Sequence, residues 1–330
     1  MNSLLMSTNH KEGLAENSLP AAWHENKSLR WTIQFSAILL VFTLIGMIVD
    51  QRTLLGDPVW LKPTKFAIST IIYVGSIMWI LSMLKDRPRL VSIVSWATAI
   101  PFIIELIIIS VQAFRGVRSH FNVGTAFDRA VFYTMGVMTL ILWVASIVAW
   151  VALLRQKFEH RAWGIVVKWA LFLTIIGSAL GGAMTTPRQA QIETAMEVGE
   201  LAELGSHSIG AVDGEGEGLP LVGWSTAGGD LRIGHFFGLH ALQILPLIGL
   251  ALLWIGRNKS DRQQRILMHI ASLGYLGFIS LITWQAFRGE PLIAPSALTL
   301  QVSAIFFSIV VTLAALVLLK KPANSQMAAA

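Results

Sequence analysis

The chain has 330 residues, of which 54% are hydrophobic and 13% are charged, and its mean hydropathy is +0.63. A soluble domain carries about 25% charged residues, so this composition excludes an ordinary soluble protein and indicates an integral membrane protein. The net charge of +6 comes from clusters that flank the apolar segments, which argues against nucleic-acid binding, and the absence of cysteine excludes disulfides and thiolate metal sites.

The apolar segments, taken in chain order, are long enough to cross a bilayer, which takes about 20 residues each. A polar N-terminal segment, residues 1–30, precedes them and lacks the apolar core of a cleavable signal peptide. Each span must be a helix, because lipid offers no partners to unpaired backbone groups. The sequence therefore predicts an all-α integral membrane protein with eight transmembrane helices: Trp31–Val49, Thr64–Leu84, Leu90–Val111, Asp128–Leu153, Ala162–Met184, Gly234–Ile255, Ile266–Ala286 and Ala297–Leu319.

Lysine and arginine gather on one side of this predicted bundle. Most of the 25 basic residues fall at the cytoplasmic ends if the N-terminus is inside, whereas acidic residues concentrate in the long outer loop, residues 185–233. The sequence therefore predicts that both termini, including the tail 321–330, are cytoplasmic.

A pentapeptide, Gln-Ala-Phe-Arg-Gly, occurs twice, at Gln112–Gly116 and at Gln285–Gly289. A Gly-Asp pair precedes each copy at the same distance, with the aspartates at Asp57 and Asp230. A fixed offset of 173 residues is typical of an internal duplication. We therefore expect two four-helix repeats, residues 31–155 and 162–320, that insert in the same direction about an axis along the membrane normal.

The arginines of the repeated motif, Arg115 and Arg288, have two interpretations. Guanidinium groups bind anions well, and together with Arg118, Lys62 and Lys65 they could form a cationic vestibule for a small anionic ligand. The favoured interpretation is structural, with ion pairs to Asp57 and Asp230 that tie helix ends together.

Glu105 is the one acid in the middle of a predicted span. A charged carboxyl at that depth costs a few kcal/mol, so we expect it either to face the bundle interior with a partner or to stay protonated. Gln112 follows it by seven residues, near the same face of the same helix, and is a second candidate for binding a ligand.

Two histidines and a glutamine, His235, His240 and Gln243, fall within an arc of about 140° on one predicted helix. The histidines are five residues apart, which is not the spacing of a helical zinc pair. A metal or haem site formed by His120, His235 and His240 stays an alternative, and the predicted depths also allow a hydrogen bond between Glu105 and His240.

The long outer loop has two predicted parts. Gln189–Leu204 has the pattern of an amphipathic helix, and 205–229 is rich in glycine. Its acidic run, Asp213–Gly218, does not fit the EF-hand pattern, which favours a turn-rich cap over a calcium loop. A loop of this length is more often a lid or a binding loop than filler.

Two segments, Gly223–Gln243 and Arg118–Asn122, resemble those of an uncharacterised family of bacterial multi-pass membrane proteins. The resemblance extends over most of the spanning region and implies a bacterial inner membrane location, but no activity. No phosphate-binding loop, nucleophile elbow or His-Glu-x-x-His motif is present in the sequence.

Three functional hypotheses follow. The first is binding or transport of a small molecule or ion at a polar His/Glu/Arg pocket near the outer face. The second is a metal- or haem-dependent membrane enzyme that uses the histidines. The third is a non-catalytic assembly or scaffold subunit with a membrane protein partner, in which the polar groups join helices.

Overall fold

The computed structural model describes residues 23–84, 86–214, 216 and 218–321. Most of the N-terminal segment 1–30, the loop residues Glu215 and Glu217, and nearly all of the tail 321–330 lie outside these described residues. Within them, eight helices are long and apolar enough to cross a membrane, which confirms the prediction of a multi-pass helical membrane protein. The chain separates into two compact units.

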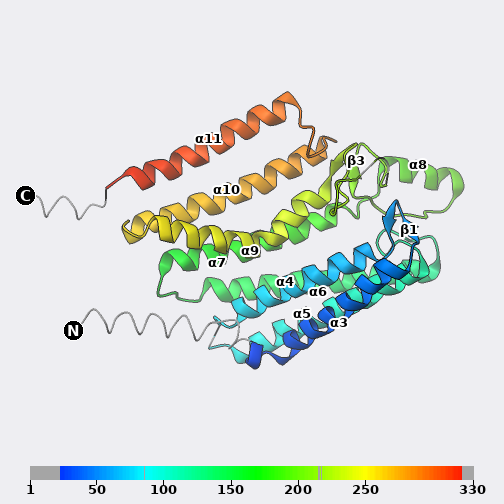
Figure 1. Ribbon diagram of the computed structural model, residues 1–330, viewed down its shortest axis with the longest axis horizontal. Coiled ribbons are helices and arrows are strands. Elements are labelled where there is room, and N and C mark those ends of the chain that lie inside the picture. The colour runs from blue at the N-terminus through cyan, green and yellow to red at the C-terminus, as the bar shows by residue number, and fades with distance from the viewer. Residues whose placement is uncertain (1–22, 85, 215, 217, 322–330) are drawn as a thin grey trace, which may run out of the picture. The chain divides into compact units, whose positions relative to one another are not determined.

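The first unit is a bundle of four helices that lie side by side (Figure 1). These helices are α3 (Lys27–Val49), α4 (Leu61–Leu81), α5 (Pro88–Arg115) and α6 (Ala126–Leu154). Helix α5 packs against each of the other three, and α3 also packs against α4. A short antiparallel hairpin, β1 (Thr53–Leu54) with β2 (Asp57–Pro58), connects α3 to α4.

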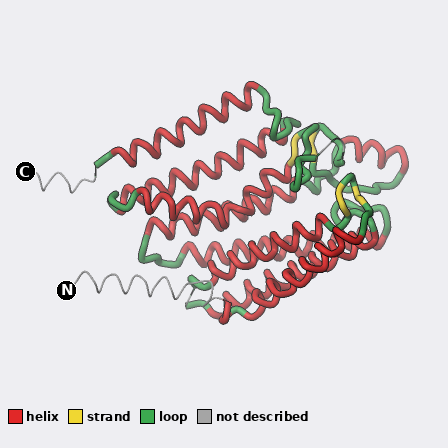
Figure 2. The backbone as a smooth tube through the Cα atoms, viewed as in Figure 1, coloured by secondary structure: helices red, strands yellow, loops and turns green. Residues whose placement is uncertain are grey.

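The second unit contains α7 (Arg161–Ala183), α9 (Leu231–Ile255), α10 (Asp261–Phe287) and α11 (Ala297–Leu319). Its buried apolar core is formed by small and branched residues of α7, α9 and α10, while α11 packs on α10. A second short antiparallel pair, β3 (Ser208–Ile209) with β4 (Gly229–Asp230), precedes α9. Figure 2 shows both strand pairs as short pieces among the loops at helix ends.

Capping residues set the helix bounds more closely than hydropathy does. Ser260 forms a capping box with Gln263, so α10 begins five residues before the predicted Ile266. In the first unit, Gly116 follows α5 and adopts a left-handed φ of 72°, so α5 ends only after Arg115. Arg115 therefore belongs to the last turn of α5, whereas Arg288 is the C-cap of α10.

Glycines allow α7 and α9 to approach closely. A Cβ atom added to Gly238 would lie 2.3 Å from the Cα of Gly177, and one added to Gly234 would lie 2.2 Å from the hydroxyl of Thr283 on α10. Small residues at such crossings let membrane helices gain dispersion contacts along their backbones. Gly238 therefore meets α7, and Gly234 meets α10.

The predicted amphipathic helix in the outer loop is shorter than expected. Helix α8 covers Gln189–Val198 and does not continue to Leu204, because Gly199 takes a left-handed φ of 79°. Residues 194–203 belong to the first unit, where the backbone amide of Val123 donates to the carbonyl of Ala202 at 3.0 Å. The long loop thus contributes a strap to the first unit.

Candidate functional site

The first copy of the repeated motif builds a buried polar network at the end of α5. Gln112, which is 1% exposed, donates its side-chain amide to the Asp128 carboxylate at 3.0 Å. The Arg115 guanidinium donates to the same carboxylate and to the Gln112 side-chain oxygen. The hydroxyl of Thr125 caps α6 by accepting from the Asp128 amide at 3.0 Å. The network joins the end of α5 to the start of α6.

The second copy joins α10 to α11 in the same way but with a different acid. Arg288 donates to Glu290 at 2.7 Å, and Glu290 accepts from the Thr299 hydroxyl and the Ser296 amide in the first turn of α11. The hydrogen bonds from Thr299 and Ser296, assisted by Arg288, lower the pKa of the Glu290 carboxyl to about 2. Gln285 donates to the carbonyl of Pro291 at 2.7 Å.

These contacts correct the predicted ion-pair partners of the two arginines. Arg115 pairs with Asp128 instead of Asp57, which is exposed in the β1–β2 hairpin. Asp230, which is fully buried, pairs with Arg232 in the first turn of α9 and accepts from the amide of Ser225 at 2.8 Å. The structural role predicted for the arginines stands, but their partners lie nearer in the sequence, across a single helix–helix connection.

The three arginines of the predicted cationic vestibule are each paired with an acid. Besides Arg115 and Arg288, Arg118 pairs with Glu203 of the strap at 2.7 Å. A guanidinium already bound to a carboxylate has little charge left for an external anion. The arrangement therefore weakens the expectation of an anionic ligand at these arginines.

A different set of titratable groups meets in the first unit. The ammonium of Lys62, in the first turn of α4, lies 3.0 Å from Nδ1 of His120 in the connection between α5 and α6. An ammonium can only donate, so His120 accepts at Nδ1 and carries its proton at Nε2. The Ser119 hydroxyl also lies 3.0 Å from this nitrogen, and the Phe66 ring stacks near the imidazole with centroids 5.9 Å apart.

Glu105 lies deeper in the same unit. It precedes the end of α5 at Arg115 by ten residues, about 15 Å along the helix axis. The Thr139 hydroxyl of α6 donates to its carboxylate at 3.4 Å, a long hydrogen bond, and Lys62 acts on it electrostatically. Glu105 is therefore a half-buried acid with weak local hydrogen bonding.

The histidines of α9 each have a partner within the second unit. Nδ1 of His235 donates to the carbonyl of Gly177 on α7 at 2.7 Å, and Nδ1 of His240 lies 3.1 Å from the side-chain oxygen of Gln243. The ring of His240 also stacks on Phe236, with centroids 4.3 Å apart. His235 therefore fastens α9 to α7, while His240 and Gln243 form a local pair on one face of α9.

The three histidines of the predicted metal or haem site fall in different units, His120 in the first and His235 and His240 in the second. Among the residues that the structure describes, no group of three or more His, Cys, Asp or Glu side chains is arranged to hold a metal ion. Glu105 and His240 likewise belong to different units, so the predicted bond between them stays a prediction.

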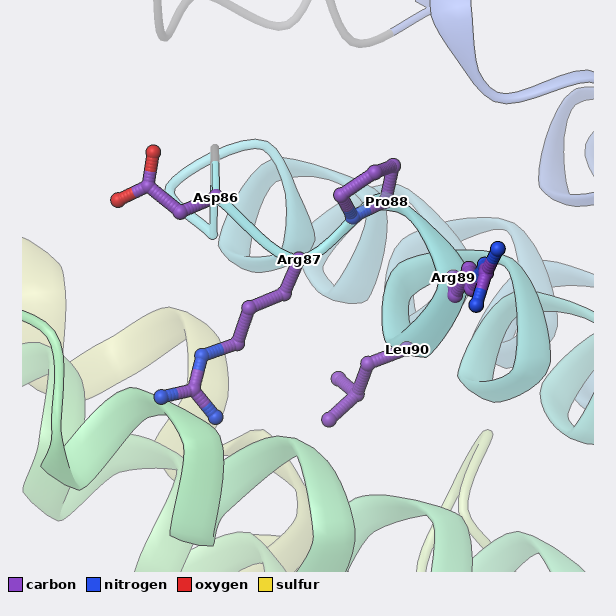
Figure 3. A pocket seen from close by; sticks show the side chains of 5 residues that line it. All are labelled: Asp86, Arg87, Pro88, Arg89 and Leu90. Carbon is purple, nitrogen blue, oxygen red and sulfur yellow. The ribbon is translucent and has the colours of Figure 1, made fainter.

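The cavities found among the described residues do not coincide with these polar groups. One is a shallow hollow at the turn between α4 and α5, lined by Asp86–Leu90, whose charged side chains diverge (Figure 3). Another is a small apolar cavity of about 90 Å³ between α5 and α6, beside Gln112 and Phe127. Neither brings several polar groups to one point.

Asp213 organises part of the outer loop, a role that its acidic, glycine-rich run did not predict. Asp213 closes the turn before β4 by accepting from the amides of His207 and Ser208 and from the Ser206 hydroxyl at 2.8 Å. Burial raises the pKa of the Asp213 carboxyl, but its bonds to His207 and Ser206 outweigh burial and hold that pKa below its usual range. The glycines on either side signalled a turn without indicating which side chain would close it.

Comparisons with protein families, with curated proteins and with solved structures find no match to this chain.

Proposed function

We propose that this protein binds and transports a small ion across a bacterial inner membrane, with Glu105 as the group that binds a proton or small cation. The observation that supports the proposal is that Glu105 lies in the same unit as the Lys62–His120 contact of 3.0 Å and that Lys62 acts on it electrostatically. Intramembrane acids of this kind typically mark ion or proton pathways.

The proposal favours a cation or a proton over the anionic ligand suggested by the sequence. Each arginine of the proposed vestibule is paired with a carboxylate, at Asp128, Glu203 or Glu290. Glu105 is the acid assigned to ion binding, and it has only the long hydrogen bond from Thr139. In this proposal His120 and Lys62 form the outer entrance to Glu105.

A purely structural role for Glu105 has weaker support. Its hydrogen bond to Thr139 is 3.4 Å long, whereas a buried acid costs a few kcal/mol when charged. Residues that join helices in this unit, such as Gln112 and Asp128, have short bonds and little exposure. A costly group with a weak local bond is better explained by ion binding than by helix association.

The test is ion flux into proteoliposomes that contain the wild type, Glu105→Gln or the control variant Glu197→Gln, whose side chain is exposed on α8. A pH-sensitive dye and sodium or potassium tracers report the ion. We expect Glu105→Gln to lose at least tenfold in flux while its thermal unfolding in detergent is unchanged or later. Equal flux in Glu105→Gln and wild type would contradict the proposal. Unfolding of Glu105→Gln at a lower temperature than the wild type would favour the scaffold hypothesis.

A metal or haem role for His240 is a second candidate. Its Nδ1 is bonded to an oxygen acceptor of Gln243, as the second nitrogen of a ligating histidine usually is. An absorption spectrum and elemental analysis of purified protein, beside His240→Ala, test this role. Stoichiometric metal or haem that disappears in the variant would support it, and a metal-free wild type would exclude it.

A further inference from the structure

The turn between α9 and α10 gathers basic side chains beside the end of α11. We call this set the basic turn: Arg257, Lys259, Arg262, Arg265, Lys320 and Lys321. All six lie at ends of membrane-spanning helices of the second unit.

Hydrogen bonds join the two chain segments of the basic turn. The ammonium of Lys259 donates to the carbonyl of Lys320 at 3.2 Å, and the side-chain amide of Gln263 donates to the same carbonyl at 2.8 Å. Gln263 is nearly buried and also takes part in the capping box of Ser260. The end of α11 is therefore fixed beside the start of α10, and the cations form one patch.

The charge of this patch is poorly balanced by protein groups. Asp261 is the acid within it and pairs with Arg265 at 3.1 Å. Arg257 stacks over the ring of Trp254, 5.9 Å from its centroid. In the described part of the chain, neither Arg257 nor Arg262 has an acidic partner within salt-bridge distance. The patch therefore keeps a net positive charge that attracts anions.

Exposed apolar side chains adjoin these cations. Trp254 is 71% exposed, Ile255 is 54% exposed and Leu319 is 80% exposed, each within three residues of a cation of the patch. A soluble anion would neutralise the cations and leave this apolar surface uncovered. An amphiphile with a phosphate head and acyl chains matches both parts of the surface, because guanidinium and ammonium groups bind phosphate and apolar side chains contact the chains.

We propose that the basic turn is a binding site for an anionic phospholipid, with the lipid phosphate held between Arg257, Arg262 and the Lys320–Lys321 segment. The lipid chains lie against Trp254 and the end of α11. This inference does not depend on the proposed ion transport.

The experiment is native mass spectrometry of the detergent-purified full chain after titration with phosphatidylglycerol, with phosphatidylcholine as the neutral lipid. The test variant is the double substitution Arg257→Gln/Arg262→Gln. The matched control is Arg87→Gln/Arg89→Gln, at the α4–α5 turn, where the charged side chains diverge (Figure 3). Each basic residue near a lipid surface contributes about fivefold in affinity, so we expect a loss of roughly 25-fold in the test variant and little change in the control.

Three further measurements distinguish specific binding of an anionic lipid from the alternatives. The charge-conserving variant Arg257→Lys/Arg262→Lys should retain most of the preference for phosphatidylglycerol. Wild-type retention should fall as salt is raised, because screening shortens the range of charge interactions. Equal retention of the two lipids by the wild type, or equal losses in test and control variants, would overturn the proposal. Thermal stabilisation by inorganic phosphate as large as that by phosphatidylglycerol would assign the site to a soluble anion and also overturn it.

Discussion

Replacing Asp128 with asparagine tests whether the first copy of the repeated motif acts through the contacts described above. The Asp128 carboxylate accepts from three side-chain donors, those of Gln112, Arg115 and Thr125, and it is 3% exposed. Asparagine keeps the shape of the side chain but offers one accepting oxygen and places an NH₂ group among donors. At least one buried donor is then left without an acceptor.

The expected magnitude follows from the burial of each donor. Gln112 is 1% exposed, so loss of its acceptor costs about 1–3 kcal/mol. The side chain of Arg115 is 35% exposed and can turn to water, so its share is that of a surface ion pair, about 0–1 kcal/mol. We therefore expect Asp128→Asn to lower the free energy of unfolding by about 2 kcal/mol, which corresponds to roughly 4–8 °C for a unit of this size.

The assay is thermal unfolding in detergent at one fixed heating rate, since membrane proteins often unfold irreversibly. The control is Asp57→Asn. Asp57 is exposed in the β1–β2 hairpin, and a surface substitution there should change stability by no more than about 0.5 kcal/mol. Equal destabilisation by the two variants would refute the pairing of Arg115 with Asp128 and restore the pairing predicted from the repeat.

Two other predictions concern helix packing and pH. Gly238→Ala places a Cβ atom 2.3 Å from the backbone of Gly177, so we expect a loss of about 1–3 kcal/mol and an earlier thermal transition, whereas Gly136→Ala, which meets open space, should stay within about 1 kcal/mol of wild type. Because the pKa of Glu290 is lowered to about 2 from its ordinary 4.5, its carboxylate stabilises the fold above pH 4.5 and loses this effect as the pH falls towards about 2. The difference in unfolding temperature between wild type and Glu290→Gln should therefore shrink over that range, and a difference that stays constant would contradict the assigned contacts.

The class of the fold could be predicted from the sequence because the membrane imposes it. Eight apolar segments of about 20 residues leave no alternative to helices, and every predicted span overlaps an observed one. The predictions were wrong at the ends of helices, where capping residues determine the bounds. Ser260 starts α10 earlier than hydropathy indicates, and Gly199 stops α8 before Leu204. Hydropathy senses burial in lipid and is insensitive to these single hydrogen bonds.

The candidate site was less predictable because it depends on which side chains meet. Glu105 could be identified from its position in the middle of a predicted span. Its lack of a strong hydrogen-bond partner depends on the fold and could not be predicted. The contact between Lys62 and His120 joins residues 58 positions apart and has no periodic signal. The sequence predicts that Lys62 and His120 both lie near the outer face, but the contact between them could not be derived from their spacing.

The ion-pair partners predicted for Arg115 and Arg288 were wrong, and the reason bears on function. The repeat suggested Asp57 and Asp230 because they recur at the same offset, yet the acids used are Asp128, thirteen residues after its arginine, and Glu290, two residues after its own.

The α5–α6 and α10–α11 connections differ in length and sequence. In each, an acid joins the end of one helix to the start of the next, but the two acids lie at unrelated positions. The arginine of each pentapeptide is therefore explained by its structural role. Lys62, Glu105 and His120, which lie outside the two pentapeptides, are therefore the better candidates for ion binding, and the flux of Glu105→Gln tests them most directly.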